Sequence, residues 1–129
     1  GFADPALLAS LMADVVLLPS GPSPLDIMAV KDALELVQEA QKSRPDLRIR
    51  FIPSKLIARA GLSNDLPQAL KDLGAPVLPG IHQRTVVAEA ALSGLTVIEY
   101  AKSSPARAEF KALCDALIKE LKPKKSKKR

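Results

Sequence analysis

The stretch VVLLPSGPSPLDIM, residues 15–28, limits what this chain can fold into more than any other feature. It opens with an unbroken apolar run, residues 15–18, which is typical of a strand buried on both faces of a parallel sheet. After a short polar loop, Ser23 suits an N-cap, Pro24 the first helical position, and Asp26 the carboxylate of a capping box. A strand that leads into a helix through a short loop is half of a βαβ unit. Ligands of such sheets bind beyond the carboxyl ends of the strands.

The rest of the chain alternates between the two patterns. Apolar residues three or four positions apart predict helices at residues 5–12, 24–42, 65–73, 85–92 and 105–121. Short apolar runs predict further strands at 48–53, 75–79 and 96–100, the last of them at the edge of the sheet. Residues 54–60 are expected to form a helical turn and 61–64 a loop. This alternation predicts an α/β fold with a parallel sheet and flanking helices.

Composition excludes several classes of protein. A chain of 129 residues supports one compact domain. Aromatic residues make up only 3%, so stacking platforms for single-stranded nucleic acid are not expected. A single cysteine cannot form an internal disulfide and fits a reducing compartment. Because no run is long enough for a membrane span and no signal peptide opens the chain, we expect a cytoplasmic protein without a membrane partner.

The net charge of +5 is concentrated at one end of the chain. The last eight residues, 122–129, hold six of the 19 basic residues and no acid, which leaves 13 bases against 14 acids elsewhere. We expect residues 1–121 to form the domain and 122–129 a disordered basic tail. Such a tail could instead contact phosphates, with nucleic acid the favoured partner over a membrane.

Three predicted strands end alike, in Pro19-Ser20, Pro53-Ser54 and Pro79-Gly80. If the strands are parallel, the three exit loops meet on one rim, where a ligand can bind. The alternative is that proline simply stops each strand.

Two other reactive side chains invite an interpretation. His82 is the only histidine, and without neighbouring ligands it indicates a solvent-facing or packing side chain rather than a metal site. Cys114 lies on the apolar stripe of the last predicted helix, so it is expected to be buried. No glycine is followed by lysine, so the chain contains no G-x-x-x-x-G-K-[ST] phosphate loop.

Two segments resemble a known family. ADVVLLPSGPSPLDIMAVKDALELV, residues 13–37, resembles the region just after switch II in ParA-type partition ATPases, which are deviant-Walker relatives of MinD. Residues 51–100 continue in register with the family pattern, and residues 1 to about 121 are covered. The second segment ends in a characteristic run, here Ile81, Gln83, Arg84, Ala88, Ala91, Gly94, Val97 and Glu99.

The resemblance implies the C-terminal half of a P-loop NTPase fold. It also implies, for the full-length family, ATP and Mg as cofactors, homodimerisation, non-specific DNA binding, association with the nucleoid, and a centromere-binding partner protein. Residue by residue, it implies a side facing the nucleotide base at Pro53, Ser54, Lys55, Pro79 and Gly80. It implies contacts between protomers at Pro19, Pro22 and Pro24. Candidate DNA contacts are Arg84 and the basic tail residues Lys122, Lys124, Lys125, Lys127, Lys128 and Arg129.

The family's phosphate-binding and switch residues lie in its N-terminal half, which this sequence does not contain. We therefore interpret the chain as a fragment of a ParA-like partition protein that does not hydrolyse ATP alone and leaves one strand edge uncovered. The alternative is a stand-alone, degenerate ParA-like binding module without nucleotide chemistry. A small α/β enzyme of another kind would need a catalytic site that the sequence does not reveal.

Overall fold

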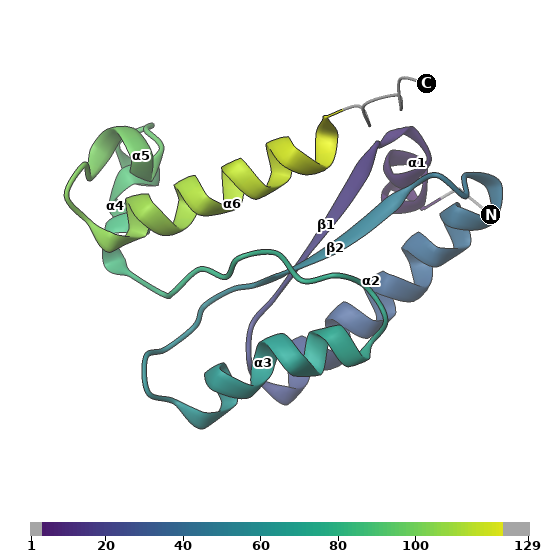
Figure 1. The fold of residues 1–129 in the computed structure, drawn as a ribbon, viewed down its shortest axis with the longest axis horizontal. Helices are drawn as coiled ribbons and strands as arrows, with labels where there is room; N and C mark the ends of the chain where they lie inside the picture. The colour runs from purple at the N-terminus through teal and green to yellow at the C-terminus, as the bar shows by residue number, and fades with distance from the viewer. Residues whose placement is uncertain (1–3, 123–129) are drawn as a thin grey trace, which may run out of the picture.

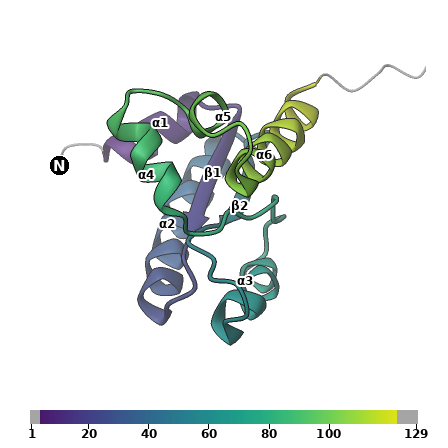
Figure 2. The same cartoon turned by 90° about the vertical axis from the view of Figure 1, so that its left-hand side faces the viewer.

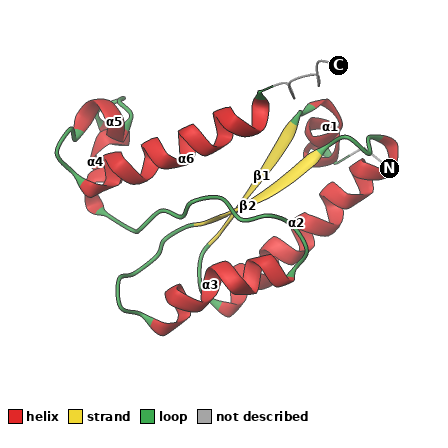
Figure 3. Ribbon diagram, in the orientation of Figure 1, coloured by secondary structure: helices red, strands yellow, loops and turns green. Residues whose placement is uncertain are grey.

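The computed structural model describes residues 4–122 and alternates helices with two strands, as Figure 3 shows. The order is α1 (Pro5–Met12), β1 (Val15–Ser20), α2 (Pro24–Ser43), β2 (Arg48–Pro53), α3 (Gly61–Asp72), α4 (Thr85–Leu92), α5 (Val97–Tyr100) and α6 (Pro105–Leu121). The predicted α/β class is therefore confirmed.

The two strands form a parallel sheet. Its register runs from Val15 opposite Arg48 to Ser20 opposite Pro53. The strand predicted over residues 15–18 thus continues two residues further, through Pro19 to Ser20. Within residues 4–122, β1 pairs only with β2, and an edge strand tolerates a proline because one side of it makes no ladder bonds.

The strand predicted at residues 75–79 is reduced to a single bridge beside β2. Val77 lies opposite Phe51, and the Phe51 N–H donates to the Pro76 carbonyl at 2.9 Å. The segment is extended, but Pro76 and Pro79 lack the N–H groups that a longer ladder needs. β2 is consequently flanked by β1 on one side and by this segment on the other.

Helices cover both faces of the sheet. Figures 1 and 2 show α2 and α3 on one face and α6 on the other. The main core lies between the sheet, α2 and α3, and includes the buried residues Leu34, Phe51, Leu66 and Leu70. A second, smaller cluster joins α4, α5 and α6 around Ala90, Val97 and Ala106.

The predicted start of α2 is confirmed. Ser23 is its N-cap and forms a capping box with Asp26. The Asp26 N–H donates to the Ser23 hydroxyl oxygen at 3.1 Å, and the Ser23 hydroxyl donates to the Asp26 carboxylate at 2.7 Å. The box fixes the end of the loop that leaves β1.

The strand predicted at residues 96–100 is wrong, because this segment forms the short helix α5. Thr96 caps it and makes a capping box with Glu99, whose carboxylate accepts a hydrogen bond from the Thr96 N–H at 3.2 Å. The reciprocal cap outweighs the β-branched composition of the segment.

The region between β2 and α3 also differs from expectation. Residues 54–60 form no helical turn, and Lys55 and Arg59 adopt left-handed conformations with φ of 55° and 63°. The loop expected at 61–64 is instead the first turn of α3, which begins at Gly61. The buried Ser63 hydroxyl accepts a hydrogen bond from the Ile57 N–H at 2.9 Å, which ties this turn to the preceding loop.

The last helix is confirmed as α6, but its apolar stripe is only partly covered. Cys114 is exposed, so the prediction of a buried thiol is wrong. Ile118 and Leu121 are 54% and 49% exposed. A stripe is buried only where another element faces it, and within residues 4–122 the buried contact of α6 is at Ala106, near its start.

Candidate functional site

The exit loops of the parallel segments meet on one rim, at the carboxyl ends of β1 and β2. The Ser54 N–H donates to the Ser20 carbonyl at 2.8 Å, which joins the first two loops. The Ile81 N–H donates to the Pro53 carbonyl at 2.8 Å, which joins the third. The structure therefore brings together the three proline-ended segments that the sequence singled out.

Gly80 marks a close approach between two of these loops. A Cβ at Gly80 would lie 2.8 Å from Cδ1 of Leu56 and 3.1 Å from both the Cβ and the carbonyl oxygen of Pro53. The contact holds the backbone of residues 79–81 directly against the end of β2. Only glycine allows this approach without displacement.

A cavity of about 460 Å³ opens beside Gly80. Its lining includes the rim residues Pro53, Pro79 and Gly80 together with Leu56 and Pro67. Pro53 is buried and Pro79 exposed, so the mostly apolar wall of the cavity opens to the surface. A wall of this kind suits a flat apolar group better than a charged one.

Lys55 lies between two further cavities on the same rim. One, of about 400 Å³, is lined by Ser20, Gly21, Asp26, Ser54 and Lys55, among others. The other, of about 540 Å³, extends from Ser54 and Lys55 past residues 81–84 to α4 and Phe110. A left-handed lysine is strained, and such strain gathers at functional sites.

The proline-rich loop before α2 lies next to this rim. Pro19 and Pro24 are exposed and Pro22 is half-buried. Gly21 is buried, and a Cβ there would collide with the Asp26 carboxylate of the capping box. The loop is therefore held in place by α2, while the prolines on either side of it, Pro19 at the end of β1 and Pro24 at the start of α2, remain accessible.

Glu109 of α6 gathers two side chains of the third exit loop. Its carboxylate lies 2.6 Å from Nδ1 of His82 and 3.2 Å from Nε of Arg84. Burial alone would raise the pKa of Glu109, but hydrogen bonds from His82 and Arg84 outweigh it and hold the pKa below its usual range. His82 thus makes a specific hydrogen bond to Glu109 and does not merely pack against the loop.

Glu109 also contacts Arg84, which is one of the candidate DNA-binding residues. Arg84 directly precedes α4 and is one-third exposed, with its Nε turned to Glu109. Sequence reasoning missed Glu109 because it lies 25 residues further along the chain. Of the other candidates, Lys122 is exposed at the end of α6, whereas Lys124, Lys125, Lys127, Lys128 and Arg129 lie outside the described residues.

Residues 4–122 contain no group of three or more side chains suited to hold a metal ion. In the same residues no helix is both long and apolar enough to cross a bilayer.

Comparison with known proteins identifies the fold. No protein-family model matches the chain. The MinD cell division ATPase of Pyrococcus furiosus superposes with a TM-score of 0.70 over 85% of this chain and 44% of its own, at 19% identity. The septum site-determining protein MinD of Pyrococcus horikoshii, solved with Mg-ADP, gives the same TM-score and coverage of this chain, with 43% of its own and 20% identity.

A curated relative agrees with these structures. The maintenance of carboxysome distribution protein A of Halothiobacillus neapolitanus is 29% identical over 99 residues, which cover 74% of this chain and 46% of that protein. The chain thus spans slightly less than half the length of the proteins it matches. The predicted resemblance to the C-terminal half of ParA/MinD-type ATPases is confirmed, as is the corresponding part of a P-loop NTPase fold.

Proposed function

Because this chain has the fold of the C-terminal part of a MinD-type ATPase, we propose that it forms the base-facing half of the nucleotide site in a ParA-like positioning ATPase. The observation that carries the proposal is the rim at the ends of β1 and β2, where Ser54, Pro79 and Gly80 converge. Ligands of open α/β sheets bind at this edge.

The residues present suit the base of a nucleotide but not its phosphates. Pro79 offers an exposed apolar wall in a cavity that the buried Pro53 also lines, and Lys55 and Ser54 add polar groups on the same rim. The sequence has no phosphate loop, and residues 4–122 contain no cluster of metal-ligating side chains. Tight binding of a triphosphate with Mg²⁺ depends on such groups, so this chain alone is expected not to hydrolyse ATP.

We further propose that the complete protein dimerises and binds DNA without sequence preference while it positions a cargo, with the help of a centromere-binding partner protein. The proposed protomer contacts are the exposed Pro19 and Pro24, which flank the loop before α2, together with Pro22 within it. Arg84 and the basic residues from Lys122 onward are the proposed DNA contacts. These proposals imply that the complete protein is cytoplasmic and associates with the nucleoid when it binds DNA.

An NMR titration of the full chain with adenosine tests the base-facing site. We expect amide shifts confined to the rim, centred on Ser54, Lys55 and Gly80, and no such shifts with ribose alone. Adenosine shifts that are absent, or that fall on α6 instead, would contradict the base-facing site. They would favour a binding module without nucleotide chemistry.

A further inference from the structure

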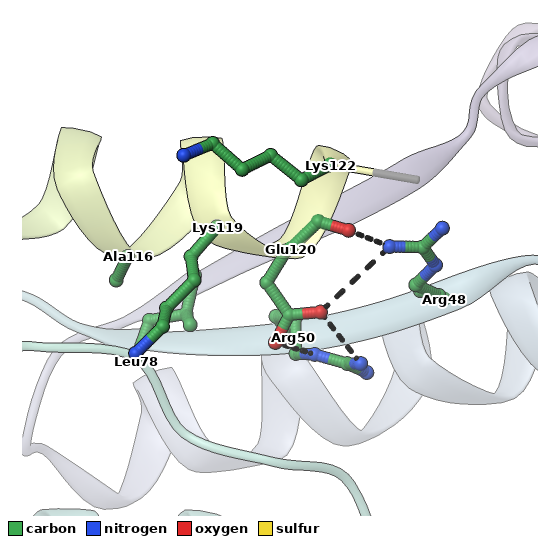
Figure 4. Close-up of a pocket in the computed structure, with 7 residues that line it drawn as sticks. All are labelled: Arg48, Arg50, Leu78, Ala116, Lys119, Glu120 and Lys122. Carbon is green, nitrogen blue, oxygen red and sulfur yellow. Dashed lines mark hydrogen bonds and ion pairs between the residues drawn. The ribbon is translucent and has the colours of Figure 1, made fainter. Parts of the chain in front are cut away.

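A basic pocket lies between α6 and β2, away from the rim, and Figure 4 shows it. It measures about 720 Å³ and is lined by Arg48, Arg50, Leu78, Ala116, Lys119, Glu120 and Lys122. Four of these side chains are basic and one is acidic. Residues 1–121 as a whole hold 13 bases against 14 acids, so this pocket is a local excess of positive charge.

Glu120 already occupies part of the pocket as an anion. Its carboxylate accepts from Nε of Arg50 at 2.8 Å and from Nη2 at 2.9 Å, a two-pronged contact. Arg48 donates to the Glu120 main-chain carbonyl and has Nη1 4.0 Å from the carboxylate. The hydrogen bonds from Arg50 hold the pKa of Glu120 below its usual range. A carboxylate in this geometry marks where a phosphate would bind, because guanidinium matches both groups alike.

The two arginines differ in how many of their hydrogen-bond donors the described residues leave for a ligand. Within residues 4–122, all three nitrogens of Arg50 donate, since Nη1 bonds the Ile49 carbonyl. Over the same residues Arg48 makes one side-chain hydrogen bond, and its side chain is 42% exposed against 17% for Arg50. Arg48 therefore retains donors that can reach a second anion.

Two lysines extend the positive charge outward. Figure 4 shows Lys119 reaching from α6 toward the strand that carries Arg50, and both Lys119 and Lys122 are exposed. The sequence then continues directly from Lys122 into the basic run of residues 124–129. The pocket and the tail are thus consecutive along the chain.

We propose that this pocket binds the phosphodiester backbone of nucleic acid, with Arg48, Lys119 and Lys122 as direct contacts and Glu120 as an internal competitor for the arginines. The inference rests on the proposed DNA binding and adds Arg48 and Lys119 to it, beyond Arg84 and the basic residues from Lys122 onward. These basic side chains line a concave pocket, which phosphates that project from a strand can enter more readily than the flat surface of an anionic bilayer can.

The first test measures binding of the full chain to a short duplex of mixed sequence by fluorescence anisotropy across a salt series. The double variant Lys119→Ala/Lys122→Ala is expected to bind on the order of 100-fold more weakly at about 50 mM salt, with a salt slope reduced by about 2. The control Lys31→Ala/Lys42→Ala removes the same charge from exposed positions on α2. It is expected to leave the slope unchanged.

The second test distinguishes a phosphate-binding site from an Arg50–Glu120 ion pair whose only role is to hold α6 in place. If Glu120 competes with phosphate, Glu120→Gln binds DNA more tightly and with a steeper salt slope, because the carboxylate charge that pairs with Arg50 and lies near Arg48 is removed. If the Arg50–Glu120 ion pair only holds α6 against β2, the same variant lowers the unfolding midpoint and leaves the DNA affinity unchanged. The second result would overturn the inference.

The outcomes also distinguish the pocket from the proposed function. If the unaltered chain does not bind DNA, the proposed DNA binding itself fails. If deletion of residues 123–129 abolishes binding while the Lys119 and Lys122 double variant binds normally, the pocket fails and tail-mediated binding stands. If the same lysines bind phosphatidylglycerol vesicles more tightly than DNA, the ligand is a lipid headgroup and the assignment to nucleic acid is overturned.

Discussion

Replacing Gly80 by alanine tests whether the three exit loops are packed as closely as the structure shows. The added Cβ would meet Leu56 Cδ1 at 2.8 Å and Pro53 Cβ and carbonyl oxygen at 3.1 Å. The leucine methyl group can rotate away at little cost. Pro53 cannot, because its ring is rigid and its carbonyl accepts the Ile81 hydrogen bond at 2.8 Å.

The contact with Pro53 therefore decides the magnitude. Inserting a methyl group into a tightly packed contact costs about 1–3 kcal/mol. The free-energy cost of weakening the hydrogen bond from the Ile81 N–H to the Pro53 carbonyl falls within that range. For a chain of this size, each kcal/mol lowers the melting temperature by about 4 °C, so we expect Gly80→Ala to melt about 4–12 °C lower.

The matched control is Gly61→Ala. Gly61 begins α3, has ordinary backbone geometry, and leaves open space where a Cβ would lie, with no atom within 4 Å. Alanine there is expected to be neutral or slightly stabilising, because it restricts the unfolded chain. Melting curves followed by circular dichroism check both variants. If Gly80→Ala and Gly61→Ala have the same melting temperature, the close contact between the loops does not constrain the fold.

Three further predictions concern the tail, the cap of α2 and Glu109. Deleting residues 122–129 removes six bases and should lower the salt slope of DNA binding by about 5, measured by anisotropy; unchanged affinity at low salt would refute it. Ser23→Ala should cost about 1 kcal/mol in urea unfolding, whereas exposed Ser103→Ala should cost nothing measurable. Because the folded pKa of Glu109 is lowered, its stabilisation is present above about pH 4.3 and lost as pH falls through the folded value. When the urea midpoint is measured as a function of pH, Glu109→Gln should therefore reduce the loss of stability at acid pH. A pH dependence identical to that of the unaltered chain would contradict the Arg84–Glu109 ion pair.

Local signals in the sequence predicted much of the fold. The run from Val15 to Leu18 and the Ser23 and Asp26 pair predicted β1 and the start of α2, because short-range backbone chemistry determines both. The error at residues 96–100 was also local. Thr96 and Glu99 have capping-box spacing, and this signal outweighs the β-branched residues between them.

Other features depend on distant partners and could not be predicted from local patterns. The burial of Cys114 was expected from a stripe, but a stripe does not reveal what lies opposite it. The contacts of Glu109 with Arg84 and of Glu120 with Arg50 join residues 25 and 70 positions apart. Sequence reasoning placed the three proline-ended loops on one rim because parallel strands must end together. It could not reveal that Gly80 is what lets them pack so closely.

The central claim is that this chain supplies the wall facing the base of a nucleotide site without the groups that hold phosphate. Phosphate release from ATP and Mg²⁺ by the purified full chain tests it most directly. The account predicts release no faster than in a protein-free control. Sustained turnover that depends on the chain and is lost in Gly80→Ala would contradict it.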